Sequence, residues 1–217
     1  MYNVSVPGSL MLFGEHSIFI YGGSIVCAIN SRITVNLSPL SNNKIFIISD
    51  NFVTLEFFLH NIEIKKPFDY ILLSILKYKK YIKYGFILRI NSCFLSNYGF
   101  GSSAAITSAV VFLLNYWLFD IKLNKINLFF ISKSIISSLQ KPSSGSDLAA
   151  SIFGGVVYYK SYPFFIKKIN LIPDIILIYS GYKKSTLEVV NLINSKLDFK
   201  NKILFLYLIN ECVENAK

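Results

Sequence analysis

The stretch from Asn97 to Phe119 contains no charged residue and consists of a short glycine- and serine-rich turn, GFGSS, followed by a long apolar run. Such a run predicts either a helix buried in a protein core or a helix that crosses a membrane. The run is shorter than the roughly 20 residues that cross a bilayer, and Thr107, Ser108 and Asn115 interrupt it. We therefore expect a buried helix over 102–119, beginning directly after the glycine turn.

The rest of the chain reads as strands first and mixed elements afterwards. Short β-branched and aromatic segments separated by Gly, Asn and Ser predict strands over 3–7, 9–13, 24–29, 32–38, 44–49 and 52–59. Helices are expected over 68–80, 102–119, 123–139, from Asp147 and twice after Ser185, with further strands over 85–92, 154–160, 163–169 and 174–180. This order predicts an α+β protein with its helices on one face of the sheet.

Composition narrows the class of protein. The chain has 217 residues, of which 53% are hydrophobic and 16% charged, as expected for a globular protein. Cys27, Cys93 and Cys212 are far apart, which indicates neither a zinc site nor a disulfide framework. The N-terminus lacks the basic flank and continuous apolar core of a signal peptide. We expect a cytoplasmic protein.

The net charge of +10 comes almost entirely from lysine. The run KYKKYIK at 77–83 alternates lysine with tyrosine, a pattern that a single-strand nucleic-acid binder could use. Lysines are also favoured at the solvated C-terminal end of a helix. Because Lys and Tyr are abundant throughout the chain, we prefer the helix end, and we predict neither nucleic acid nor membrane as a partner.

The glycine turn has the chemistry of an anion site. Gly99 and Gly101 permit backbone angles at which successive N–H groups point inward around an anion. The free N–H groups and the dipole of the following helix add positive charge. Ser102 and Ser103 are either helix caps or ligands of a magnesium ion carried by phosphates. An ordinary glycine turn with a serine cap remains the alternative at this point.

Two other stretches carry polar groups beside glycines. PGSLMLFGEH at 7–16 places Glu15 and His16 after an apolar strand-like run, either as a satisfied core pair or as a clamp for a substrate. PSSGSDLAAS at 142–151 places Asp147 at the start of a small-residue helix. That carboxylate is either ordinary N-terminal helix decoration or a group that orients or deprotonates an attacking hydroxyl.

These stretches, in this order, resemble the GHMP kinase superfamily, which includes galactokinases, homoserine kinases, mevalonate kinases and phosphomevalonate kinases. PGSLMLFGEHSIFIYGG is similar to its N-terminal motif, NYGFGSSAA to its phosphate-binding motif and KPSSGSDLAASIFGG to the segment with the catalytic aspartate. SGYKKSTLEVV at 180–190 resembles a later segment of the same members. The resemblance implies a ribosomal protein S5 domain 2-like N-terminal domain over 1–161. An incomplete ferredoxin-like C-terminal domain would follow over 162–217.

The resemblance also implies roles for particular residues. Asp147 would act as the catalytic base or orienting group, and Ser103 would also bind Mg²⁺. Glu15, His16, Gly145 and Thr186 would contact a small hydroxy acid such as mevalonate. The ATP phosphates would lie on a set of seven residues, namely Asn97, Gly99, Phe100, Gly101, Ser102, Ser103 and Ala104.

The sequence departs from the family pattern at several positions. Ser9 replaces a lysine that lies near the transferred phosphate, so Lys141 or Lys184 would have to supply that charge. Ile136 stands where mevalonate kinases carry a second magnesium ligand. The glutamine at position 140 resembles the pattern of phosphomevalonate kinases instead. A third, glycine-rich motif is not found after residue 181.

We therefore expect a mevalonate kinase-like enzyme, with a phosphomevalonate kinase or another GHMP kinase as the alternative. A truncated, inactive nucleotide-binding relic is the alternative from another class. A homodimer is left open.

Overall fold

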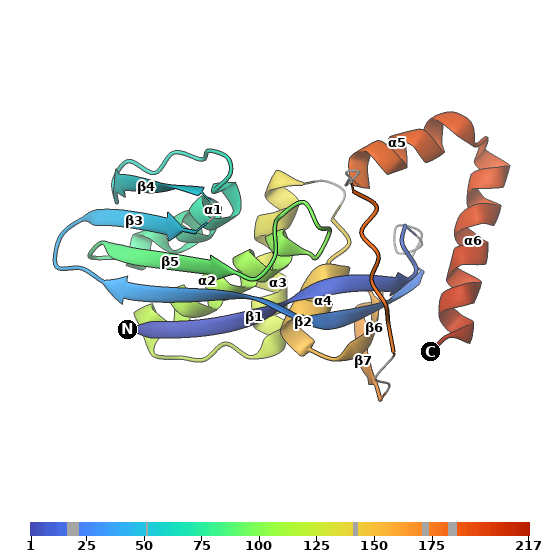
Figure 1. Cartoon of the computed structure of the whole chain (residues 1–217), viewed down its shortest axis with the longest axis horizontal. Helices are drawn as coiled ribbons and strands as arrows, with labels where there is room; N and C mark the ends of the chain where they lie inside the picture. Colours follow the sequence, from blue (N-terminus) through green and yellow to red (C-terminus); the bar gives the residue numbers. More distant parts are fainter. Residues whose placement is uncertain (17–21, 51, 141–142, 171–173, 182–185) are drawn as a thin grey trace.

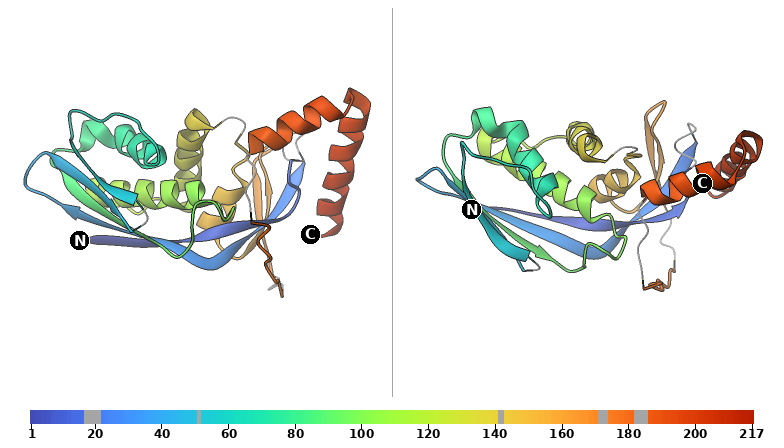
Figure 2. Two further views of the ribbon diagram at one scale, coloured as in Figure 1. Left: turned by 45° about the horizontal axis from the view of Figure 1, so that its top comes forward. Right: turned by 90° about the horizontal axis from the view of Figure 1, so that it is seen from above.

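The computed structural model describes residues 1–16, 22–50, 52–140, 143–170, 174–181 and 186–217. Within these ranges seven strands form one sheet in the order β4-β3-β5-β2-β6-β7, with β1 paired to β2. Helices α1 to α4 cover one face of this sheet, and α5 and α6 lie at one end of it (Figures 1 and 2). The predicted α+β class with helices on one face is confirmed.

The bounds of the elements follow the sequence pattern closely in most places. The strands are β1 (Tyr2–Phe13), β2 (Gly23–Pro39), β3 (Lys44–Ser49), β4 (Phe52–Phe58), β5 (Phe86–Ser92), β6 (Val156–Lys160) and β7 (Phe165–Ile169). The helices are α1 (Asp69–Tyr78), the short 3₁₀ helix η2 (Lys79–Tyr81), α2 (Ser102–Phe119), α3 (Lys125–Leu139), α4 (Ser146–Phe153), α5 (Thr186–Lys196) and α6 (Phe199–Asn215).

The long strand β2 organises the sheet. Its first part, 23–27, pairs with β6, and its last part, 33–39, pairs with β5. β1 pairs with β2 along most of its length, with register shifts between Pro7 and Ser9 and between Met11 and Phe13. The prediction of two separate strands in each of these regions is wrong, because the interruptions are absorbed as irregularities inside continuous strands.

Helix α2 lies in the core, as predicted. Ten of its residues are buried, and its apolar side chains join those of the sheet, α1 and α3 in one cluster. Among the described helices, α2 is the one that is long and apolar enough to cross a membrane, and 56% of it is buried in the fold. Its uniform apolarity reflects a helix covered on most of its surface.

The C-terminal part differs from the expectation. Residues 174–180, predicted as a strand, form no strand, and Ile176 and Ile178 are 89% and 90% exposed. A strand needs a partner for its backbone groups, and none of the described strands pairs with this segment. β7 continues the same sheet as β6, so the predicted boundary at residue 161 falls between two paired strands. The division into two domains stays a prediction.

Candidate active site

The glycine turn leads directly into α2 with left-handed backbone angles. Gly99 has φ +80° and Gly101, the N-cap of α2, has φ +60°. No side chain in the described part of the chain caps this helix, so the N–H groups of its first turn remain available to an external acceptor. A Cβ on Gly99 would meet no atom within 4 Å. The turn therefore presents backbone donors beside open space, which suits an anion such as phosphate.

Strand β1 packs closely against the other side of this turn. The register shift after Pro7 releases the Ser9 N–H from the pairing with β2, and it donates to the Phe100 carbonyl at 3.1 Å. A Cβ on Gly8 would lie 2.9 Å from the same carbonyl oxygen. Glycine at position 8 and the local bulge together allow the backbones to approach.

Asp147 faces the glycine turn from the first turn of α4. Its Oδ1 accepts a hydrogen bond of 2.7 Å from the Ser9 hydroxyl. A Cβ on Gly101 would lie 2.0 Å from Ser9 Oγ and 3.1 Å from Asp147 Cγ. Asp147 is half-buried, and the helix N-terminus favours its charged form. The phosphate-like turn and the carboxylate thus lie side by side, with Ser9 between them.

A buried polar network supports the start of α4. Gly145, with φ +88°, caps the helix where a Cβ would lie 2.9 Å from Tyr159 Oη. The fully buried Tyr159 donates to the Ser144 carbonyl at 2.8 Å, and burial raises the pKa of its hydroxyl. The buried hydroxyls of Ser24 and Ser146 lie 3.1 Å apart. These contacts fix the backbone that carries Asp147.

Lys133 reaches this network from α3. Its ammonium donates to Tyr159 Oη at 3.2 Å and lies over the rings of Phe129 and Tyr159. Burial lowers the pKa of Lys133. The cation therefore adds to the support beneath the turn at Ser144 and Gly145.

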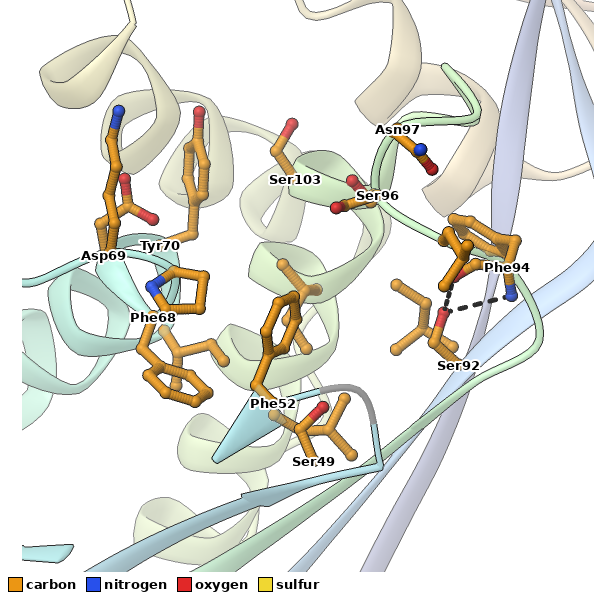
Figure 3. A pocket seen from close by; sticks show the side chains of 18 of the residues that line it. Ser49, Phe52, Phe68, Asp69, Tyr70, Ser92, Phe94, Ser96, Asn97 and Ser103 are labelled. Carbon is orange, nitrogen blue, oxygen red and sulfur yellow. Dashed lines mark hydrogen bonds between the residues drawn. The ribbon is translucent and has the colours of Figure 1, made fainter. Parts of the chain in front are cut away.

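A cavity of about 780 Å³ opens beside the glycine turn. Figure 3 shows Ser103 and Asn97 at one side of it, Asp69 and Tyr70 at the other, and the rings of Phe52 and Phe68 below. Apolar rings with a few polar groups around them are typical of a site for a flat, partly polar ligand. The cavity is continuous with the first turn of α2, because Ser102 and Ser103 line it.

Tyr70 joins three elements at the rim of this cavity. Its hydroxyl donates to Gln140 Oε1 at 3.2 Å and interacts with the hydroxyl of Ser103. Burial and the charge of Asp69 raise the pKa of Tyr70, whereas the Ser103 contact lowers it. Tyr70 therefore links the end of α3 to the start of α2 at this rim.

The donor set near the turn suits a magnesium ion that is bound mainly through phosphates. The described residues contain no cluster of three or more His, Cys, Asp or Glu side chains able to hold a metal. Ile136 is buried in the core among Phe129, Leu148 and Tyr159, so that position offers no metal ligand. Mg²⁺ commonly takes one or two protein ligands together with phosphate oxygens, and the Ser103 hydroxyl could be one of them.

The residues predicted to bind the acceptor are described only in part. Glu15 and His16 lie in the turn after β1 rather than in a strand, and Glu15 is exposed. A Cβ on the adjacent Gly14 would lie 2.8 Å from Val213 Cγ2, so α6 covers this turn. Thr186 begins α5, but its side chain is outside the described residues, as are Lys141 and Lys184.

Comparison with known proteins agrees with this geometry. The pattern of the GHMP kinases N terminal domain matches residues 69–155, from α1 through the glycine turn to the end of α4. A mevalonate kinase of Saccharolobus solfataricus is 28% identical over all of this chain and 70% of its own length. Residues 69–155 are a GHMP kinase N-terminal domain.

Two solved structures share the fold of this chain. The mevalonate kinase of Methanococcus jannaschii superposes with a TM-score of 0.80 at 21% identity, covering 99% of this chain and 72% of the other. A phosphomevalonate kinase of Streptococcus pneumoniae, in complex with phosphomevalonate and AMPPNP, superposes with a TM-score of 0.63 at 21% identity. The superposition covers 74% of this chain and 50% of the other. The predicted GHMP kinase fold is confirmed, and the chain spans about 72% of the Methanococcus jannaschii structure.

Sequence reasoning missed Ser9 as a partner of Asp147 and treated it only as a lost charge. A polar residue within the apolar run SLMLF was the available signal. Tyr70 and the cavity rings carried no such signal, because their grouping depends on how α1, the β3–β4 hairpin and β5 pack.

Proposed function

We propose that this protein is a GHMP kinase that transfers the γ-phosphate of ATP to a hydroxyl group of mevalonate. The observation that carries the proposal is the carboxylate of Asp147 beside the left-handed turn at Gly99 and Gly101, bridged by Ser9. The similarity to curated mevalonate kinases over the whole chain supports the choice of acceptor.

In the proposed complex, the triphosphate lies on the backbone donors from residues 97–104, and the nucleoside occupies the adjoining cavity. The rings of Phe52 and Phe68 would contact the base, with Asp69 and Ser49 able to meet its polar edge. Ser103 would bind the Mg²⁺ that neutralises phosphate charge during transfer.

Asp147 would act on the acceptor hydroxyl. Phosphoryl transfer depends mainly on positioning and charge neutralisation, so a carboxylate that accepts the hydroxyl proton also aligns the oxygen with the γ-phosphate. The α4 N-terminus favours the ionised form that this role requires. The positive dipole end of α2 would stabilise the charge that develops on the phosphate oxygens.

The acceptor would be held by Glu15, His16, Gly145 and Thr186. Of these, Gly145 is closest to the site, since it caps the helix that carries Asp147. Phosphomevalonate is the second candidate acceptor, favoured by Gln140 at the rim of the cavity and by the likeness to a phosphomevalonate kinase fold.

The test is an assay with ATP, Mg²⁺ and either mevalonate or phosphomevalonate. We expect transfer to mevalonate, and a loss of about 10²- to 10⁴-fold in kcat for Asp147→Asn. Asp120→Asn is the matched control, because Asp120 is exposed at the C-terminal end of α2 and Asn also adopts its left-handed backbone.

Each other result has a distinct meaning. Transfer to phosphomevalonate and not to mevalonate would show that phosphomevalonate is the acceptor. Nucleotide binding without transfer to either acceptor would favour the inactive relic, and equal activity in Asp147→Asn would reject the role of Asp147. We further propose a cytoplasmic enzyme; light scattering would decide whether it forms a homodimer.

A further inference from the structure

We propose that Ser9 is a positioning residue that holds the carboxylate of Asp147 and the phosphate-binding turn in a fixed relation. Its hydroxyl bonds to the carboxylate, and its backbone N–H bonds to the turn. The consequence for catalysis rests on the proposed kinase function, whereas the orientation of Asp147 can be measured independently.

The hydrogen bond from the Ser9 hydroxyl to Asp147 is buried and charge-assisted. Ser9 is fully buried, so bulk water does not compete for its single hydroxyl proton. A hydrogen bond from a hydroxyl to a carboxylate is of the charge-assisted, stronger kind. With Oδ1 engaged at 2.7 Å, the side chain of Asp147 cannot change its rotamer without breaking this bond.

The backbone contact fixes the other half of the site. The bulge in β1 places the Ser9 N–H 3.1 Å from the Phe100 carbonyl. A Cβ on Gly8 would lie 2.9 Å from Phe100 O, and a Cβ on Gly101 would lie 2.0 Å from Ser9 Oγ. Neither Gly8 nor Gly101 leaves room for a side chain beside Ser9. Ser9 therefore sets the spacing between the turn and the carboxylate.

Serine carries no charge, so its contribution at this position is orientation rather than neutralisation of phosphate. A base already held in its working rotamer needs no reordering when the acceptor hydroxyl arrives. Loss of the Ser9 hydroxyl should therefore reduce kcat and leave nucleotide binding, which relies on backbone donors, largely unchanged.

The experiment compares the wild type with Ser9→Ala, Ser9→Cys and Ser132→Ala. Ser132 is the matched control, since it is also fully buried but its hydroxyl has no hydrogen-bond partner among the described residues. Three-bond NMR couplings of Asp147 report its χ1 rotamer. Steady-state kinetics with ATP and mevalonate report kcat and KM.

We expect a single Asp147 rotamer in the wild type and in Ser132→Ala, and averaged couplings in Ser9→Ala. The cysteine variant leaves no cavity at this position but has only a weak donor, so it should show the same averaging even if Ser9→Ala does not fold. The kcat value should fall roughly 10- to 100-fold with the KM for ATP unchanged.

Unchanged couplings in both Ser9 variants would overturn the proposal, as would an equal effect of Ser132→Ala. If the wild type transfers phosphate to no acceptor, the proposed function fails, but the couplings still decide the role of Ser9.

Discussion

The two regions of this chain differ in how far their apolar side chains are buried. In the sheet and helices α1 to α4, side chains such as Phe86, Phe129 and Tyr159 are fully buried. In residues 174–215, Ile176, Ile178 and Phe199 are more than 80% exposed. The turn, Ser9 and Asp147 all belong to the packed region. The difference indicates that the candidate site can be held rigidly without help from the C-terminal region.

Among the described residues, helix α6 contacts the packed region at a few points. Val213 and Leu206 are buried, and Asn210 Oδ1 accepts the Gly23 N–H at 2.9 Å. Tyr158 donates to Glu214 Oε1 at 2.6 Å, and Lys217 also pairs with Glu214. These contacts lie on β2 and β6, and Figure 1 shows α6 beside this end of the sheet.

The largest expected effect concerns the packed region. Leu148, which follows Asp147, is 1% exposed. Leu148→Ala should lower the free energy of unfolding by about 2–5 kcal/mol, because it leaves a cavity beneath α4. Urea denaturation followed by circular dichroism measures this. A loss below about 0.5 kcal/mol would show that the region is not tightly packed.

The second effect separates the two glycines of the turn. Both have positive φ, so alanine costs each about 1–2 kcal/mol of strain. Only at Gly101 does the added Cβ also collide with Ser9. We expect Gly101→Ala to weaken MgATP binding at least about tenfold more than Gly99→Ala, as measured by calorimetry. Equal losses would mean that contact with Ser9 does not shape the turn.

A smaller effect is expected where α6 is attached. The hydrogen bond from Lys217, and then that from Tyr158, lower the pKa of Glu214. The stabilisation that ionised Glu214 gives to the fold is therefore complete above the ordinary glutamate pKa of about 4.3. It is lost as the pH falls through the lower pKa that Glu214 has in the folded protein. The Val213 methyl resonances should shift in this acidic range in the wild type. The same shift in Glu214→Gln would exclude Glu214 as its cause.

The smallest effect is expected in the exposed segment. Ile178→Ala should change the free energy of unfolding by less than about 0.5 kcal/mol, since the side chain is 90% exposed. The same denaturation experiment used for Leu148→Ala provides the comparison. A loss of several kcal/mol would show that Ile178 is covered in solution and would remove the contrast between the two regions.

The sequence allowed the local elements of the site to be predicted, because they depend on neighbouring residues. Gly101 followed by an apolar run predicts a helix start, and Asp147 after Gly145 predicts a second one; both are present. The prediction that the two lie together depended on the family resemblance. Local pattern alone does not determine which strand brings two helix starts into contact.

The features that could not be predicted depend on pairing and packing over long distances. The bulge at Gly8 is defined only by the register of β1 against β2, and the contact between Ser9 and Asp147 spans 138 positions. Residues 174–180 have the composition of a buried strand, but a strand also needs a pairing partner. Composition reports how apolar a segment is and carries no information about that partner.

The most direct test of the account is a crystal structure of the protein with Mg²⁺ and a non-hydrolysable ATP analogue. We predict that the triphosphate lies on the backbone amides from Gly99 to Ala104, with the γ-phosphate facing the Asp147 carboxylate and the base in the cavity beside Phe52 and Phe68. A nucleotide bound elsewhere, or a γ-phosphate directed away from Asp147, would contradict it.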